Sequence, residues 1–237
     1  MIKIPVTCSL LLAFMLSFAS CATQISGSLQ ADGQTDLNIF ASLKPRMATL
    51  IMGFAAVAGI APGTAILDGP AISASMAHAP GIASVSLSNT SPVSIEGQVQ
   101  SSHIGEFLAA GGTDFITFQE MAGGGGRFTA SLDRDSGRDI LALISPDITN
   151  YLAALMAPVA TGEAMTGDEY LFLVGAVYGS AIAYEIAGAT IRAWIDFPGP
   201  IQSVRGGTFS GRRAEFAIPL LDILVLETPL HYEVVWR

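Results

Sequence analysis

Cys21 is the residue whose type and position most directly suggest a chemical modification. It follows an apolar run, Ser9–Phe18, and two small residues, and Lys3 supplies a positive charge ahead of that run. A charged start, an apolar middle and a small-residue end are the features of a secretion signal. Cys21 directly follows the small residues at the end of this segment.

The segment Phe18-Ala19-Ser20-Cys21 resembles the lipobox of bacterial lipoproteins. In that family the leader is cleaved before the cysteine, which then carries a thioether-linked diacylglycerol and usually an N-acyl chain such as palmitate. Phe18 and Ser20 depart from the commonest box, and relaxed boxes of this kind are typical of spirochaetes. The resemblance implies a signal peptide over residues 1–20 and lipidation of Cys21. It also implies a place in the cell membrane or outer membrane, facing the periplasm or the cell surface.

Two other interpretations of this segment stay open. Residues 1–20 could be an ordinary signal peptide with Cys21 incidental, or an uncleaved anchor, although a membrane span needs about 20 apolar residues. Acyl chains on Cys21 would hold the protein on a membrane almost permanently, since each buried methylene contributes about 0.8 kcal/mol. Cleavage also removes Cys8, so the acylated chain would have no disulfide and no cysteine nucleophile.

The rest of the sequence contains no recognisable catalytic or metal-binding motif. The serines lie outside the G-x-S-x-G pattern, and no Ser-His-Asp set can be assembled from the sequence. His78, His103 and His231 lie far apart, without a second ligand at short spacing, so we predict no metal site and no cofactor. Segment 133–139 faintly resembles a calcium loop, but its aspartates and serine favour the capped start of a helix.

Four arginines form a local concentration of positive charge in an acidic chain: Arg192, Arg205, Arg212 and Arg213. Arginine binds phosphate and carboxylate groups through paired hydrogen bonds, so the cluster could contact an anionic headgroup or a glycan. The alternative, which we favour, is a set of strand and turn arginines paired with neighbouring acids such as Asp196 and Glu215.

Composition argues against nucleic acid as a partner and for exposed apolar surface. The formal net charge is −9, and removal of Lys3 with the leader makes it more negative. Nucleic-acid binding rests instead on positive charge that neutralises phosphates. Only 13% of residues are charged and 51% are hydrophobic, against about 25% charged in a typical domain. Such a chain must bury most of itself or present apolar area to a lipid or a protein.

Alternating apolar residues predict three antiparallel hairpins after a short lipidated tether, residues 21–24. Asp32-Gly33 in the first hairpin is a dipeptide typical of tight turns. The second is expected to turn at Asn89-Thr90-Ser91. The predicted strand pairs are Ile25–Ala31 with Thr35–Leu43, Ile82–Ser88 with Pro92–Gln100, and Asp114–Met121 with Arg127–Asp133.

Helical patterns lie between and after these hairpins. Tyr170–Ala189 is apolar enough to mimic a membrane span, but Glu185 within it and the strand directly after it favour a buried helix. Small residues four apart within it predict close packing against another element. The expected helices are Pro45–Val57, a stretch over Thr64–Ala79 interrupted at Gly69-Pro70, a short one capped by Ser102, one from Ser145 to about Ala157, and Gly167–Ala187.

The C-terminal third is predicted to be rich in strands. Its final strand alternates well and is expected to pair inside a sheet. One helical turn is predicted at Pro219–Leu224. The expected strands are Thr190–Phe197, Ile201–Arg205, Arg213–Ile218 and Leu230–Trp236.

Turn signals in this region give a second resemblance. F-P-G-P-I at Phe197–Ile201 precedes G-G-x-x-x-G at Gly206–Gly211 and an alternating strand. With the first hairpin, this resembles the envelope lipoproteins of unknown function that include the mycobacterial LppM group. The resemblance implies association with the cell envelope and with lipid or glycolipid, and no functional residue transfers. This sequence differs from that group in ending on its last strand, without a C-terminal membrane helix.

These observations predict a single α+β domain over residues 25–237, in which antiparallel β-hairpins pack against apolar helices. The function expected first is that of a membrane-anchored, non-enzymatic envelope lipoprotein that acts as a lipid-binding or interaction module. Its partners would be the membrane, through the N-terminal lipid anchor, and a lipid ligand or an envelope protein. The alternatives are a structural partner in an envelope protein complex and an unrecognised hydrolase.

Overall fold

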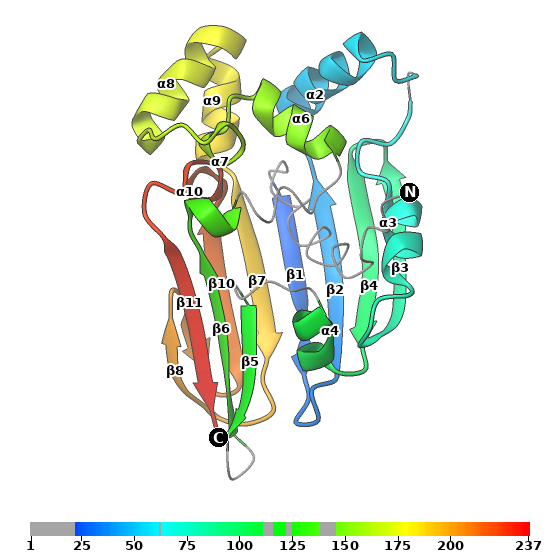
Figure 1. Cartoon of the computed structure of the whole chain (residues 1–237), viewed down its shortest axis with the longest axis vertical. Helices are drawn as coiled ribbons and strands as arrows, with labels where there is room; N and C mark the ends of the chain where they lie inside the picture. Colours follow the sequence, from blue (N-terminus) through cyan, green and yellow to red (C-terminus); the bar gives the residue numbers. More distant parts are fainter. Residues whose placement is uncertain (1–21, 62, 111–115, 122–124, 138–145) are drawn as a thin grey trace.

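The computed structural model describes residues 22–61, 63–110, 116–121, 125–137 and 146–237, so Cys21 and the leader lie outside the described residues. Two β-sheets lie face to face over part of their width, and a group of helices covers one end of both (Figure 1). The α+β class is therefore confirmed.

A seven-stranded sheet with the order β3-β4-β2-β1-β7-β10-β9 runs through the whole molecule. Among the strands that the structure describes, β1 and β7 form the one parallel pair, and they join the N-terminal to the C-terminal half of this sheet. Its strands are β1 (Ala22–Leu29), β2 (Thr35–Ser42), β3 (Ile82–Ser91), β4 (Ser94–Ser101), β7 (Thr190–Asp196), β9 (Thr208–Ser210) and β10 (Arg213–Pro219).

A four-stranded antiparallel sheet, ordered β5-β6-β11-β8, lies over the C-terminal half of the larger sheet (Figure 1). Aromatic rings fill the space between the sheets, where Trp236 stacks on Phe118 at 6.1 Å and contacts Phe197 at 4.9 Å between ring centroids. The closing strand lies inside this sheet, as predicted. The strands are β5 (Ile116–Met121), β6 (Gly125–Leu132), β8 (Ile201–Arg205) and β11 (Leu230–Trp236).

All three predicted hairpins are confirmed, with shifted ends. Gly33 takes a positive φ of 81° in the first turn, which explains the Asp-Gly signal. The second hairpin turns at Pro92-Val93, because β3 continues to Ser91. Asn89, expected in that turn, instead accepts a hydrogen bond from the backbone N of Gly69 at 3.0 Å and so holds the start of a helix.

Two of the helices begin at other residues than expected. Gly69-Pro70 begins a helix instead of interrupting one, since the Asp68 side chain accepts from the N of Ala71 at 3.0 Å. His103 precedes α4 in place of Ser102, and its Nδ1 accepts from the N of Glu106 at 3.3 Å. The helices are α2 (Pro45–Val57), α3 (Gly69–Met76), α4 (Ile104–Ala110), α6 (Pro146–Ala154), α7 (Pro158–Thr161), α8 (Gly167–Tyr178), α9 (Ser180–Ala187) and α10 (Leu220–Val225).

The predicted long helix over Gly167–Ala187 is two helices that fold against each other. Gly179 breaks it with φ 96° and ψ 147°. A Cβ placed on Gly175 would lie 3.7 Å from the Cβ of Ala183, so the small residues allow α8 and α9 to pack closely. In the described parts of the chain, no helix combines the length and apolar character required to cross a membrane.

Polar contacts hold the helices together at the end of the sheets. The carboxylate of Glu185 on α9 accepts from the backbone N of Arg46 at 3.2 Å and of Met47 at 2.8 Å. These are free N–H groups at the start of α2, where the helix dipole favours a negative charge. Lys44 adds a hydrogen bond from Nζ to the carbonyl oxygen of Gly188 at 3.4 Å. Glu185, the charge that argued against a membrane span, therefore joins α9 to α2.

Two tyrosines of α8 reach the end of α6. The Tyr170 hydroxyl donates to the Leu155 carbonyl at 3.2 Å, and the Tyr178 hydroxyl donates to the carbonyl of Ala154. Burial raises the pKa of Tyr170 well above its usual range. The Tyr178 ring also meets Phe54 of α2 edge to face, with 5.8 Å between centroids. Helices α2, α6, α8 and α9 thus form one packed group.

Replacement of Glu185 by alanine should destabilise the fold, because it leaves two helix N–H groups without their carboxylate. A lost cap costs about 1 kcal/mol, which chemical denaturation can measure. Glu163→Ala, at an exposed glutamate in the loop before α8, is the matched control and should leave stability near the parent value. Equal stability of the two variants would show that the Glu185 contact does not hold the helices.

Candidate functional site

The outward face of the seven-stranded sheet, opposite the four-stranded sheet, carries rows of polar side chains. Strand pairing aligns Ser26 with Asn38 and Trp194, and aligns Trp194 with Glu215. The next outward row contains Asp36, Ser28, Asp196 and Arg213. Successive side chains of a strand point to opposite faces, so the apolar residues between these positions pack into the core.

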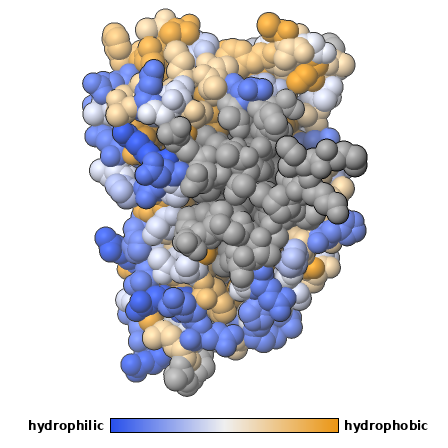
Figure 2. Space-filling model, in the orientation of Figure 1, coloured by the Kyte–Doolittle hydropathy of each residue, from blue (hydrophilic) through white to orange (hydrophobic). Residues whose placement is uncertain are grey.

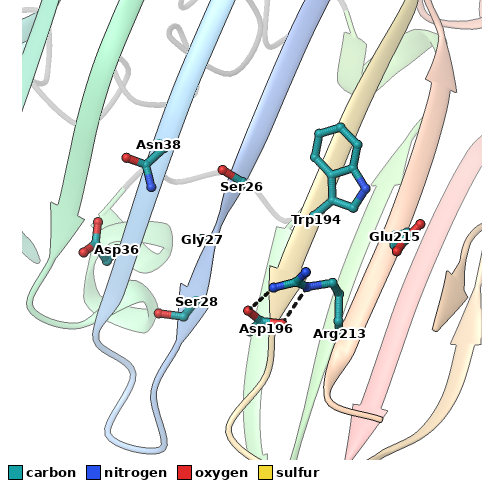
Figure 3. Close-up of a pocket in the computed structure, with 9 residues that line it drawn as sticks. All are labelled: Ser26, Gly27, Ser28, Asp36, Asn38, Trp194, Asp196, Arg213 and Glu215. Atoms are coloured by element: carbon teal, nitrogen blue, oxygen red, sulfur yellow. Dashed lines mark hydrogen bonds and ion pairs between the residues drawn. The ribbon is translucent and has the colours of Figure 1, made fainter. Parts of the chain in front are cut away.

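These two rows enclose an open hollow of about 560 Å³ that follows β1. Figure 3 shows it from the side opposite to Figure 1, with β1 between β2 and β7. Small serines of β1 form the floor, and larger side chains of β2 on one side and of β7 and β10 on the other form the walls (Figure 3). We call it the polar furrow; it is lined by Ser26, Gly27, Ser28, Asp36, Asn38, Trp194, Asp196, Arg213 and Glu215.

The floor of the furrow depends on the close approach of β1 to β2. A Cβ built on Gly27 would lie 2.0 Å from the carbonyl oxygen of Asp36, much nearer than any real contact. A side chain at this position would therefore push the two strands apart. Glycine at position 27 therefore allows the backbones of β1 and β2 to lie close together beneath the furrow.

An ion pair forms the lower part of one wall. Arg213 donates to Asp196 through Nε at 2.9 Å and through an Nη at 2.7 Å, a two-pronged geometry (Figure 3). The hydrogen bond and the nearby guanidinium lower the pKa of Asp196, and the carboxylate raises the pKa of Arg213. Asp36 and Glu215 add two further carboxylates to the lining. The furrow is therefore net negative, which suits an uncharged or cationic ligand better than an anionic one.

Side-chain hydrogen bonds continue across the face from the furrow toward β3. Gln98 on β4 donates through Nε2 to Oδ1 of Asn38 at 3.0 Å, and Ser84 donates to Oε1 of Gln100 at 2.9 Å. Trp194 is half-buried and stands on β7 between Ser26 of β1 and Glu215 of β10 (Figure 3). An indole ring beside amide, hydroxyl and carboxylate groups offers both a flat apolar surface and hydrogen-bond partners.

The four arginines singled out from the sequence are divided between the two sheets. Arg213 is paired with Asp196, and Arg212 donates through Nε to the carbonyl of Phe197 at 2.8 Å. Arg192 is exposed on β7, in the row nearer the helices. Arg205 ends β8 of the smaller sheet, opposite Glu233. The anionic-ligand hypothesis stays a prediction, and the furrow shares only Arg213 with it.

Other candidate groups are placed as follows. In the described residues no three histidine, cysteine or acidic side chains gather as metal ligands would. Asp133 caps a helix start by accepting from the N of Ser136 at 2.8 Å, as expected, and this bond lowers the pKa of Asp133; Asp139 lies outside the described residues.

Ser131 and His231, far apart in sequence, share a hydrogen bond of 2.7 Å on adjacent strands. Sequence spacing carried no signal of that pair.

The predicted acylation site precedes the first strand without a linker. Cys21 itself lies outside the described residues, but residues 22–24, expected as a tether, belong to β1. Ala22 pairs with Ser42 at the end of β2 and with Thr190 at the start of β7.

Gly27→Ala should destabilise the protein, because the added methyl group collides with the backbone of β2. Overpacking of this kind costs about 1–3 kcal/mol. Gly53→Ala is the control: no atom lies within 4 Å of its new Cβ in helix α2, so alanine should stabilise by about 0.5–1 kcal/mol. Denaturation curves of both variants test the claim, and an unchanged midpoint for Gly27→Ala would contradict the close approach.

The Asp196–Arg213 pair should stabilise the fold at neutral pH and lose that effect in acid. Because the folded-state pKa of Asp196 is lowered, its contribution is present above the ordinary aspartate pKa of about 3.9 and is lost as the pH falls through the lowered value. Asp196→Asn should thus be less stable than the parent near pH 7, with a difference that shrinks below about pH 4. Arg213→Gln and the double variant complete a cycle; additive effects would show that the two groups do not interact.

Comparison with known proteins leaves the family of this chain unassigned. No family model matches it, and no curated protein matches it. It is similar to the folded domain of the Mycobacterium tuberculosis protein LppM, solved by NMR, with a TM-score of 0.42 and 11% sequence identity. The superposition covers 91% of this chain and 88% of that one.

Proposed function

We propose that the protein is a lipid-anchored, non-enzymatic component of a bacterial envelope, and that its polar furrow binds an extended, hydrogen-bonding ligand. The anchor is the predicted lipobox at Cys21, directly ahead of β1. The observation that supports binding most is the furrow itself, in which polar groups from four strands surround one half-buried indole.

The chemistry of the furrow favours a polar ligand over a lipid. Serine, asparagine, aspartate, glutamate and arginine line it beside a single tryptophan, and an acyl chain would bury these groups without hydrogen bonds, which is costly. A sugar chain of the envelope fits better, because its hydroxyl groups can pair with the walls while a ring face rests on Trp194. Of the two kinds of module expected from the sequence, we therefore propose the interaction module.

Along the strands of the larger sheet, the furrow lies toward the end that is farther from the proposed anchor. Ser28 is six residues beyond Ala22 along β1, and a strand advances about 3.3 Å per residue. Helices α2 and α9 adjoin the Ala22 end, since α2 follows β2 and β7 follows α9. An anchored molecule would thus hold the furrow away from the membrane, where an envelope polymer can reach it.

The anchor is tested with Cys21→Ser in a bacterial host. The variant should accumulate as unprocessed precursor without acyl chains, because the attachment sulfur is lost. Mass spectrometry of the membrane fraction measures both properties. A fully processed, membrane-bound Cys21→Ser protein would contradict lipid anchoring.

The fluorescence of Trp194 tests ligand binding in the furrow. The other tryptophan, Trp236, is buried with 2% exposure, so a ligand should leave its emission unchanged. Titration with an N-acetylglucosamine tetramer should change the emission and saturate. Trp194→Ala should weaken binding at least about tenfold, or 1.4 kcal/mol. Calorimetry measures the affinity of this variant, which lacks the fluorescent reporter. Phe40→Ala removes an aromatic ring one row away on the same face and should leave the affinity unchanged. Equal loss in both variants, or no saturable binding, would overturn the furrow proposal.

A further inference from the structure

One end of the molecule exposes a large apolar surface made of helices. Phe172 on α8, Tyr184 on α9 and Val57 on α2 are 80%, 77% and 91% exposed. Figure 2 shows hydrophobic residues gathered at the end where Figure 1 places α2, α8 and α9. The ring of Phe54 on α2 meets that of Tyr178 on α8 edge to face, so these two helices touch at this end. We call it the apolar end; its large exposed members are Met52, Val57, Phe172, Val177 and Tyr184.

The apolar end is also free of charge along the chain. No charged residue or histidine occurs in Met47–Leu67 or in Tyr170–Tyr184. Three of the four charged residues that flank these stretches cap helix starts: Glu185 caps α2, Asp68 caps α3 and Glu169 bonds to Thr166 at the start of α8. The fourth, Arg46, is exposed in the first turn of α2. Large exposed clusters of apolar side chains are rare on soluble monomers, and they mark contact with a protein, a ligand or a membrane.

The position of Ala22, the first residue that the structure describes, favours a membrane as the partner of the apolar end. Ala22 pairs with Ser42, which leads through Leu43 and Lys44 into α2, and with Thr190, which closely follows α9. Helices α2, α8 and α9 lie beyond this end of the strands (Figure 1). One residue, Cys21, separates Ala22 from the proposed acyl chains, and an extended residue spans at most about 3.6 Å. Acyl chains held so close to β1 bring the bilayer surface to the level of these helices.

We propose that the apolar end is a second membrane contact, in which the exposed faces of α2, α8 and α9 enter the interfacial layer of the bilayer that holds the lipid of Cys21. The proposal rests on the lipid anchor. Helices that lie in a membrane interface bury their apolar face about 5–10 Å into the headgroup and acyl boundary. Tyrosine is favoured at that depth, as Tyr184 would be. Two contacts, anchor and helices, then fix the orientation of the protein and direct the furrow away from the membrane.

Single-cysteine labelling tests the contact on the processed, lipidated chain. With Cys8 removed and Cys21 acylated, Val57→Cys and Phe172→Cys each carry the only free thiol for a nitroxide. Phe209→Cys on β9, 46% exposed and paired with the end of β10 far from the helices, is the matched control. Each protein is placed on vesicles of phosphatidylethanolamine and phosphatidylglycerol. Power saturation then compares the accessibility of each label to oxygen and to a water-soluble nickel chelate.

The labels at 57 and 172 should show a several-fold rise in the ratio of oxygen to nickel accessibility on vesicles, while the label at 209 stays aqueous. Nickel accessibility at 57 and 172 equal to that at 209 would overturn the inference. Spin coupling between molecules without oxygen accessibility would overturn it too, since a second copy would then cover the end. If the labels at 57 and 172 give the contradicting result, flotation of the parent protein with vesicles shows which claim has failed. A parent that floats shows that the lipid anchor holds and only the helix contact is wrong. A parent that does not float shows that the anchor is wrong as well.

Discussion

The parallel pairing of β1 with β7 is the interaction on which the rest of the structure depends. It joins Ala22 to Thr190 and Ser28 to Asp196, and thereby unites the half-sheet β3-β4-β2-β1 with β7-β10-β9. The same register brings Ser26 beside Trp194 and so forms the furrow. It also fixes the start of the described chain at the end of the sheet that the helices cover. Without this pair there would be neither a continuous polar face nor a defined direction from anchor to furrow.

Local patterns predicted most elements but not their assembly. Asp32-Gly33, the proline at the start of α2 and the alternation of β7 carry their signals within a few residues, and each element formed where expected. The β1–β7 pair links opposite ends of the sequence, and a parallel register leaves no turn signal between its strands. The sequence also did not predict the break at Gly179, because a glycine in an apolar helix is compatible with close packing and with a turn. In the structure Gly175 provides the close packing of α8 on α9, and Gly179 provides the turn between them.

The candidate site was hidden in a pattern that usually marks a solvated strand face. Ser26, Asn38 and Trp194 each occupy the polar half of an alternating strand, so nothing but the sheet register shows that they share one furrow. The arginines, by contrast, cluster in sequence and separate in space, because β8 enters the smaller sheet while β7 and β10 stay in the larger one. Cys21 is the opposite case again: its interpretation comes entirely from sequence, and the structure adds where the residue after it lies.

The molecule has an apolar end beside its proposed anchor and a polar furrow farther along β1, and β1 fixes this order. Hydrogen–deuterium exchange of the processed, lipidated chain tests this most directly, because it reports whether the amides of β1 are hydrogen-bonded inside the sheet. If β1 lies inside the sheet, the amides of residues 23–29 should exchange as slowly as those of β7. Rapid exchange over 23–29 with a protected β7 would contradict the account, since the first strand would then be a tether and the anchor would no longer orient the furrow.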